Sequence, residues 1–190
     1  MKNTTKFAGV LTMLAMALAM ATVSASAQLN SNTGTVTINA NLPESLTVSL
    51  TNPTVTIPLT SNTAVNNSTA PAAGTAIQTA WVLQPGRTSV KVFVYAAVAN
   101  PLANTLGTDT IPATSILISN TGQGGAYSAL AAGTPFGTGL QIGASTAITG
   151  ANKASSRTDT VFFQINTTFN PQLSAGTYTG TLNVQAQATP

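Results

Sequence analysis

Apolar and polar residues alternate along most of this sequence beyond residue 33, and threonine commonly fills the polar positions. Successive side chains of a β-strand point to opposite faces, so a period of two rich in β-branched residues predicts strands that bury one face. Two such runs follow Pro43 and Pro53. The first run of all, which we call the apolar row, consists of Val36, Ile38, Ala40 and Leu42.

The segment from Ile77 to Ala96 predicts a hairpin. Apolar positions alternate from Ile77 to Leu83 and again from Val90 to Ala96, with a turn at 84–87 between them. Pro85 and Gly86 stand at the two central positions of that turn, where these residues are favoured. A single tryptophan in a strand-rich chain usually belongs to the core. We therefore expect Trp81 to pack between two sheets.

The second half of the chain predicts shorter strands separated by turns. We expect strands over 111–118, 160–169 and 178–186, with short strands around Leu140 and Ile142. Trp81, Phe163 and Tyr178 are the expected core anchors. No segment beyond residue 27 keeps a helical period, so the pattern of about eight or nine strands favours an all-β, Ig-like antiparallel β-sandwich, with a closed barrel as the alternative.

Residues 1–27 have the three parts of a secretory signal peptide. Lys2 and Lys6 begin it, an apolar run follows, and Ala25-Ser26-Ala27 supplies the small residues of a cleavage site. Cleavage after Ala27 would leave residues 28–190 as a single domain with no membrane span, secreted to the periplasm or held at the cell surface. An uncleaved N-terminal anchor is the alternative.

Catalytic chemistry has few candidate residues here. The chain has no cysteine and no histidine, which excludes disulfides, thiolate nucleophiles, Ser-His-Asp triads and the usual zinc sites. The carboxylates beyond the leader, Glu44, Asp109 and Asp159, are far apart in sequence, whereas a glycosidase needs two in one cleft and calcium needs several together. Basic residues are not clustered as nucleic acids require. We expect no enzyme activity, no cofactor or metal and no nucleic-acid partner.

With so few titrating groups, stability should change little from about pH 3 to about pH 8.

The surface chemistry favours contacts between strand edges. Charged residues make up only 5% of the chain. Charged side chains commonly prevent exposed strand edges from pairing with other chains. Edge-to-edge pairing is useful in a subunit that polymerises. Phe93, Tyr95 and Phe162 lie opposite their apolar rows, and such a surface aromatic patch would instead indicate a carbohydrate- or ligand-binding module.

Two stretches resemble spore coat protein U-type and related chaperone-usher pilin subunits. The first is 33–42, TGTVTINANL, followed by Leu46-Thr47-Val48. The second is 171–184, PQLSAGTYTGTLNV, with a proline loop, an Ala-Gly pair, an aromatic residue and an alternating last strand. The resemblance implies an adhesive or structural pilus subunit whose partners are copies of itself or related subunits, and a periplasmic chaperone.

The resemblance also implies donor-strand complementation, in which an N-terminal extension of one subunit completes the sheet of its neighbour. Residues 28–42, which we call the extension, would be the donor, and the apolar row would set its register. The same alternation also suits the first strand of the chain's own domain. Both roles for the extension remain open at this point.

Overall fold

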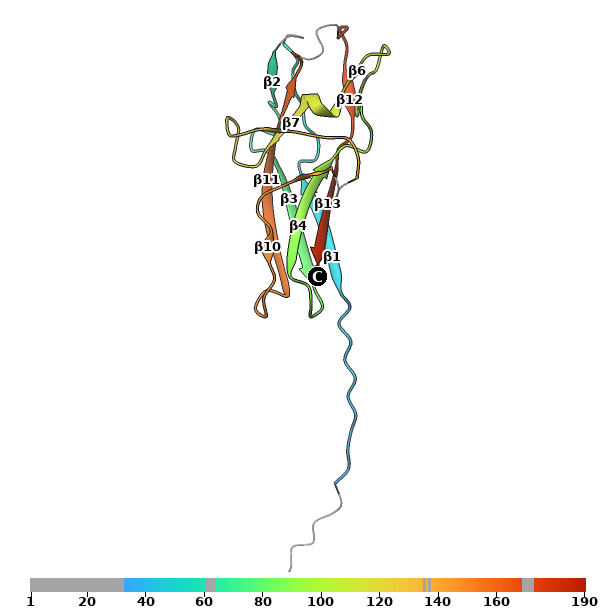
Figure 1. Cartoon of the computed structure of the whole chain (residues 1–190), viewed down its shortest axis with the longest axis vertical. Coiled ribbons are helices and arrows are strands. Elements are labelled where there is room, and N and C mark those ends of the chain that lie inside the picture. The colour runs from blue at the N-terminus through green and yellow to red at the C-terminus, as the bar shows by residue number, and fades with distance from the viewer. Residues whose placement is uncertain (1–32, 61–63, 135, 137, 169–172) are drawn as a thin grey trace, which may run out of the picture. The chain divides into compact units, whose positions relative to one another are not determined.

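The computed structural model describes residues 33–60, 64–134, 136, 138–168 and 173–190, and this part of the chain is all-β. Figure 1 shows the ribbon of the chain. Every pair of described strands is antiparallel. The predicted leader, residues 1–27, lies outside the described residues. Within those ranges no helix has the length and hydropathy needed to cross a bilayer.

The strands are β1 (Ser45–Thr51), β2 (Val65–Asn67), β3 (Thr75–Val82), β4 (Ser89–Tyr95), β5 (Leu102–Asn104), β6 (Thr110–Ile111), β7 (Ile116–Ser119), β8 (Ser128–Ala129), β9 (Leu140–Gln141), β10 (Thr146–Ala147), β11 (Ala154–Asn166), β12 (Tyr178–Gly180) and β13 (Asn183–Thr189), with one 3-10 turn, η1 (Ala113–Ser115).

The chain divides into two units, residues 1–41 and residues 42–190. In the described part of the first unit, residues 33–41 form no strand. The side chains of Val36 and Ile38 are 86% and 84% exposed, and Leu42, the first residue of the second unit, is 76% exposed. A strand forms only where its backbone groups find partners. The alternation at 35–42 therefore has the pattern of a strand but is not paired within this structure.

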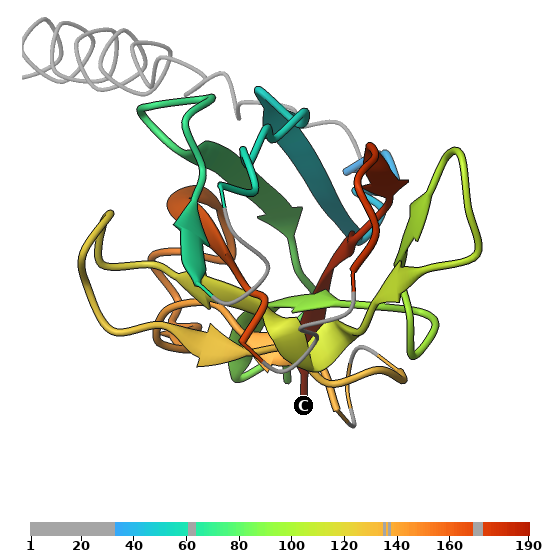
Figure 2. The ribbon, with the colours of Figure 1, turned by 90° about the horizontal axis from the view of Figure 1, so that it is seen from above.

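Three sheets make up the second unit. The first has the order β1-β3-β11-β7-β8, with β2 also on β11. The second has the order β10-β4-β13, with β9 also on β4, and the third has the order β12-β5-β6. Inward side chains of the first two sheets share one apolar core, which includes Ile77, Val92, Val94, Ile118 and Val161. Figure 2 shows the ribbon from above.

The segment around the turn at 84–87 is not the predicted hairpin. Strands β3 and β4 form as expected, but β3 pairs with β1 and β11, whereas β4 belongs to the other sheet. Gly86 has a φ of 102° and follows Pro85, as in a type II turn. The twist of that turn does not match the twist of a tight hairpin. The chain instead crosses from one sheet to the other, and both strands bury their apolar faces against the shared core.

Three predicted strands are changed by breaks in their ladders. The run Val55, Ile57 and Leu59 keeps alternating burial but has only one bridge among the described residues, from Thr56 to Ala70, because Pro53 before the run and Pro58 within it lack an N–H. The expected strand over 111–118 is divided by η1. The expected last strand over 178–186 is divided into β12 and β13, which belong to different sheets. Strands β9 and β11 lie where the sequence predicts strands, although β11 begins earlier, at Ala154.

Candidate functional site

Strands β1 and β13 each end a sheet in the second unit. Among the described residues, β1 pairs only with β3, and β13 pairs only with β4. Each strand therefore leaves a row of backbone N–H and C=O groups that pair with no further described strand, although parts of β1 and β13 lie close to each other. Residues of both strands line two cavities that share no lining residue, and we call the two cavities together the groove.

The upper part of the groove is a cavity of about 560 Å³ with an apolar lining. Leu50, Val55 and Ile57 contribute from β1 and the segment that follows it. Leu182, just before β13, and Val184, within it, contribute from the other side. Core residues complete the lining, among them Ile77, Val94, Val161, Phe163 and Ile165. Phe163, Leu182 and Val184 are half-buried and expose apolar surface between β1 and β13, whereas Ile77, Val94 and Val161 in the same lining are buried.

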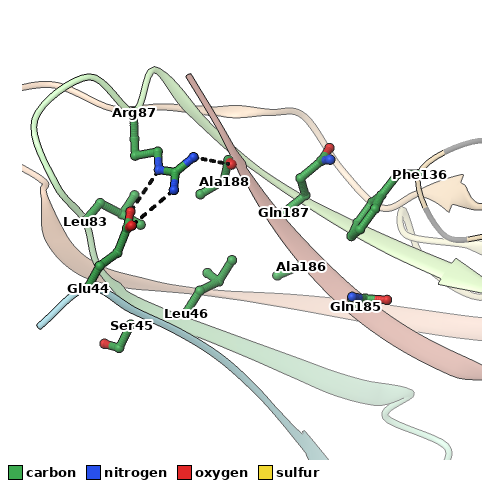
Figure 3. Close-up of a pocket in the computed structure, with 10 residues that line it drawn as sticks. All are labelled: Glu44, Ser45, Leu46, Leu83, Arg87, Phe136, Gln185, Ala186, Gln187 and Ala188. Atoms are coloured by element: carbon green, nitrogen blue, oxygen red, sulfur yellow. Dashed lines mark hydrogen bonds and ion pairs between the residues drawn. The ribbon is translucent and has the colours of Figure 1, made fainter.

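The lower part of the groove is a smaller cavity of about 350 Å³, bordered by an ion pair (Figure 3). Arg87 Nε donates to Glu44 Oε1 at 2.9 Å, and Arg87 Nη2 donates to Glu44 Oε2 at 3.1 Å. Arg87 Nη1 also donates to the Ala188 carbonyl of β13 at 3.5 Å. The hydrogen bond from Arg87 lowers the pKa of Glu44. The pair therefore connects the residue before β1 to the end of β13.

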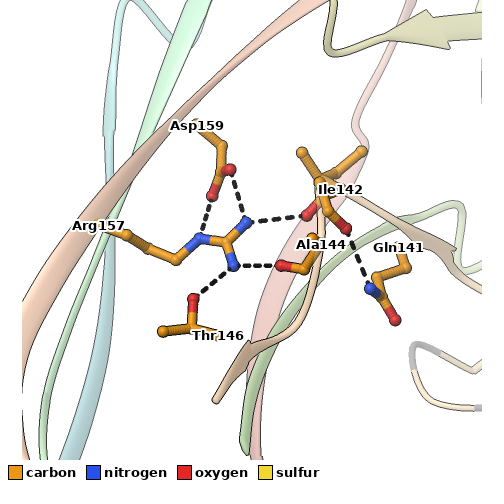
Figure 4. A network of polar contacts seen from close by, with 7 residues as sticks. Gln141, Ile142, Ala144, Thr146, Arg157 and Asp159 are labelled. Atoms are coloured by element: carbon orange, nitrogen blue, oxygen red, sulfur yellow. Dashed lines mark hydrogen bonds and ion pairs between the residues drawn. The ribbon is translucent and has the colours of Figure 1, made fainter. Parts of the chain in front are cut away.

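A second ion pair, Arg157 with Asp159, lies within β11, and Arg157 also connects β11 to the segment that carries β10 (Figure 4). Arg157 donates to both carboxylate oxygens of Asp159, at 2.7 and 2.6 Å. It also donates to the carbonyls of Ile142 and Ala144 and to Thr146 Oγ1, at 3.1, 2.6 and 2.9 Å. Both side chains are only 15% exposed. The first and second sheets are thus connected by a dense polar network on this side, whereas β1 and β13 border an open apolar groove.

The carboxylates Glu44, Asp109 and Asp159 do not meet in either cavity of the groove. Glu44 and Asp159 are paired with arginines, and Asp109 Oδ2 accepts a hydrogen bond from the Ser174 N–H at 2.8 Å. Hydrogen bonds from Ser174 lower the pKa of Asp109. Of the three, only Glu44 lines either cavity. The part of the chain that the structure describes holds no group of three or more His, Cys, Asp or Glu residues that could bind a metal ion.

The expected core anchors lie in or beside the core. Trp81 is 3% exposed, and its Nε1 donates to the Asn152 carbonyl at 2.8 Å. Phe163 is half-buried against the core, and Tyr178 is half-buried in the lining of the upper cavity.

The three candidate surface aromatics lie on two different sheets. Phe93 and Tyr95 lie on the face of β4 opposite its buried valines, whereas Phe162 belongs to β11. Phe136, which stands in a glycine-rich stretch with no periodicity and was not predicted, packs edge-on against Phe93 with ring centroids 5.5 Å apart.

Comparison of the chain with protein-family models, with curated proteins and with solved structures gave no match.

Proposed function

We propose that this chain is an exported, non-enzymatic structural or adhesive subunit of a pilus or surface polymer, and that it assembles by donor-strand complementation. One observation carries the proposal: between the open edges of β1 and β13, apolar core residues line a groove. The apolar row supports it, because its side chains have the period of a strand and are exposed. A groove with two unpaired edges and an unpaired strand-like segment are chemically complementary.

The strand order supports an Ig-like sandwich that accepts its last strand from outside. In the seven-strand form of that fold, strands A, B, E and D make one sheet, and C, F and G make the other. The order β1-β3-β11-β7 corresponds to the first sheet, and β4 and β13 correspond to C and F. The Tyr178 hydroxyl donates to the Ser174 carbonyl at 2.9 Å, a hydrogen bond similar to that of the tyrosine corner, although Tyr178 begins β12, the strand before β13. The open edge of β13 is the place of strand G.

The spacing of the apolar row fits this place. Alternate residues of a strand are about 6.6–6.8 Å apart, so the four residues of the row form four evenly spaced contacts. Leu182, Val184 and Ala186 pack against the core with the same period. Backbone hydrogen bonds to the open edges would supply affinity, and the four apolar side chains would set the register. The predicted leader and the resemblance to chaperone-usher subunits support export and a periplasmic chaperone that protects the groove before assembly.

The test compares residues 28–190 with a truncated chain, 43–190, by light scattering and negative-stain microscopy. We expect polymers from the longer chain and soluble protein without polymers from the truncated one. In the longer chain, Ile38→Asp should abolish polymers because it places a charge in the groove. Thr37→Asp, its matched control, adds the same charge on the opposite face and should leave polymers intact. A well-folded monomer from 28–190 that truncation unfolds would contradict the proposal.

A second candidate function, carbohydrate binding, is favoured by one surface. Phe93 contacts Phe136, and Gln185 and Gln141 are its partners on β13 and β9. Aromatic rings next to amide donors and acceptors suit neutral sugars. This function would be favoured if the protein is retained on insoluble polysaccharides and the Phe93→Ala variant is not. Phe162→Ala, which changes the other sheet, is the control and should retain binding.

A further inference from the structure

We infer that the groove of each subunit takes the extension of a second copy, and that Pro43 and Glu44 prevent a subunit from filling its own groove. The inference rests on the proposed function, and it identifies which extension occupies the groove. Pro43 and Glu44 are the residues that connect the apolar row to β1.

The connection limits how the extension could reach its own groove. Because residues 35–42 directly precede β1, they could lie along the open edge of β1 only as an antiparallel hairpin that turns at 43–44. Two-residue hairpin loops are type I′ or II′, and both require a positive φ at the first loop residue. That residue is Pro43, whose ring holds φ near about −65°. The shortest loop is therefore excluded.

The register of this hairpin would also expose the wrong face of the extension. If Leu42 lay opposite Ser45, Asn41 would lie opposite Leu46, and Asn39 would lie opposite Val48. Directly opposite residues of an antiparallel pair point to the same face. Leu46 and Val48 pack against core clusters, so the two asparagines would enter the groove and the apolar row would face solvent. A shift of one residue is needed to reverse this.

A three-residue loop gives that shift, but this sequence does not suit it. Such loops end in a residue in the left-handed conformation, which is normally glycine. Here that residue would be Glu44 or Ser45. The Glu44 carboxylate is held by Arg87 and accepts a further hydrogen bond from the Gln84 N–H at 3.4 Å, and Ser45 is already paired with Val82. Longer loops would take residues from the apolar row itself.

The extension of a second copy has none of these restrictions. It has no short covalent link to the β1 that it joins, so its direction and register are free to place all four residues of the apolar row in the groove. Along the open edge of β1, the chain therefore favours exchange between molecules over closure within one molecule.

Two variants of residues 28–190 test this with the same turn in two registers. In the fold-back variant, Pro43 is deleted and Glu44→Asn and Ser45→Gly are introduced. An Asn-Gly loop, the preferred type I′ sequence, then joins Leu42 to Leu46 and places Ala40 opposite Val48. In the control, Pro43→Asn and Glu44→Gly place the same loop between Leu42 and Ser45, which keeps the wrong face inward. Both variants lack the ion pair with Arg87.

We expect the fold-back variant to be a monomer with residues 36–42 protected from proteolysis at least about tenfold, while the wild type and the control form polymers. If the fold-back variant polymerises like the wild type, or if the control also becomes a protected monomer, the inference is wrong and strand donation itself can still hold. A wild-type monomer with a protected extension also overturns it, because the subunit would then fill its own groove. A wild-type monomer with an unprotected extension would contradict the proposed function. It would also contradict the inference that the extension of a second copy occupies the groove.

Discussion

Arg157 connects two sheets through its guanidinium group, which makes it a sensitive position for stability. Its carboxylate partner Asp159 is 15% exposed, so an Arg157→Ala change leaves a mostly buried charge without its partner. Breaking such a pair typically destabilises the folded state by about 3–5 kcal/mol. We expect a loss of this size in urea unfolding. The double variant Arg157→Ala with Asp159→Ala should recover part of the loss, because it removes the unpaired charge. Equal losses in the single and the double variant would contradict this account.

Two other carboxylates give the protein a weak dependence on acid. The pKa values of Glu44 and Asp109 are lowered from their ordinary values of 4.5 and 3.8, chiefly by hydrogen bonds from Arg87 and Ser174. A carboxyl group whose pKa is lowered on folding stabilises the protein above the unfolded pKa, and this contribution is lost as the pH falls through the folded pKa. The sequence alone predicts nearly constant stability down to about pH 3. With these two lowered pKa values, we expect the loss of stability to begin at a higher pH than that.

We expect the melting temperature to be constant from about pH 8 to about pH 5 and to fall below about pH 4. Thermal unfolding followed by circular dichroism at each pH measures this. Glu44→Gln and Asp109→Asn should each reduce the acid-dependent fall, because each removes one of the titrating groups. A fall that begins near neutral pH would contradict the prediction, since the chain has no histidine to titrate there.

At the residue scale, the sequence predicted burial better than it predicted polar partners. Trp81 is buried as expected, because alternation identifies which face of a strand is apolar. The partners Glu44 and Arg87 are far apart in sequence, and their contact depends on how β1 lies beside the turn at 84–87. Alternation gives no information about such pairs. The sequence shows Pro43 and Glu44 only as the residues between two alternating runs, and the place of Glu44 beside the groove required the structure.

At the element scale, the sequence predicted most strands but not which strands pair. Apolar faces of β3 and β4 suit both a hairpin and two sheets that face each other, and only the hand of the Pro85-Gly86 turn distinguishes them. Strand breaks at Pro112 and between β12 and β13 were missed because alternation continues through them. The groove was therefore not predicted, since it depends on which strands end each sheet.

Gly180 is the residue on which the junction of β12 with β5 depends. A Cβ at this position would collide with the Pro101 carbonyl, which belongs to the backbone and has little freedom to move. We expect Gly180→Ala to destabilise the protein by roughly 1–3 kcal/mol, as overpacking does. Because Gly180 also lines the upper cavity, the variant should slow polymer formation as well. Gly150→Ala is the matched control, because a Cβ there meets no atom within 4 Å. Equal unfolding midpoints for the two variants would contradict the prediction.

For the whole molecule, the balance of apolar and charged groups determines how the proposed polymer should respond to solvent. The apolar row has no charged neighbour within residues 33–42, and the upper groove is lined by uncharged side chains. Screening by salt weakens only interactions between charges, mostly exposed ones. Urea solvates apolar and peptide groups and so acts on the contacts that the donated strand would make.

We therefore expect polymer formation by residues 28–190 to change by less than about twofold between about 0.05 M and about 1 M sodium chloride, because charge screening has little to act on. Light scattering against time measures the rate, and sedimentation measures the polymer at equilibrium. Sub-denaturing urea should slow assembly in the same buffers, which makes it the positive control. The Arg87→Ala variant distinguishes the contribution of the ion pair to assembly from that of the apolar groove. We expect its assembly to be as insensitive to salt as that of the wild type. A steep loss of polymer with sodium chloride in the wild type that Arg87→Ala removes would show that the ion pair holds subunits together, and that apolar insertion along β1 and β13 does not.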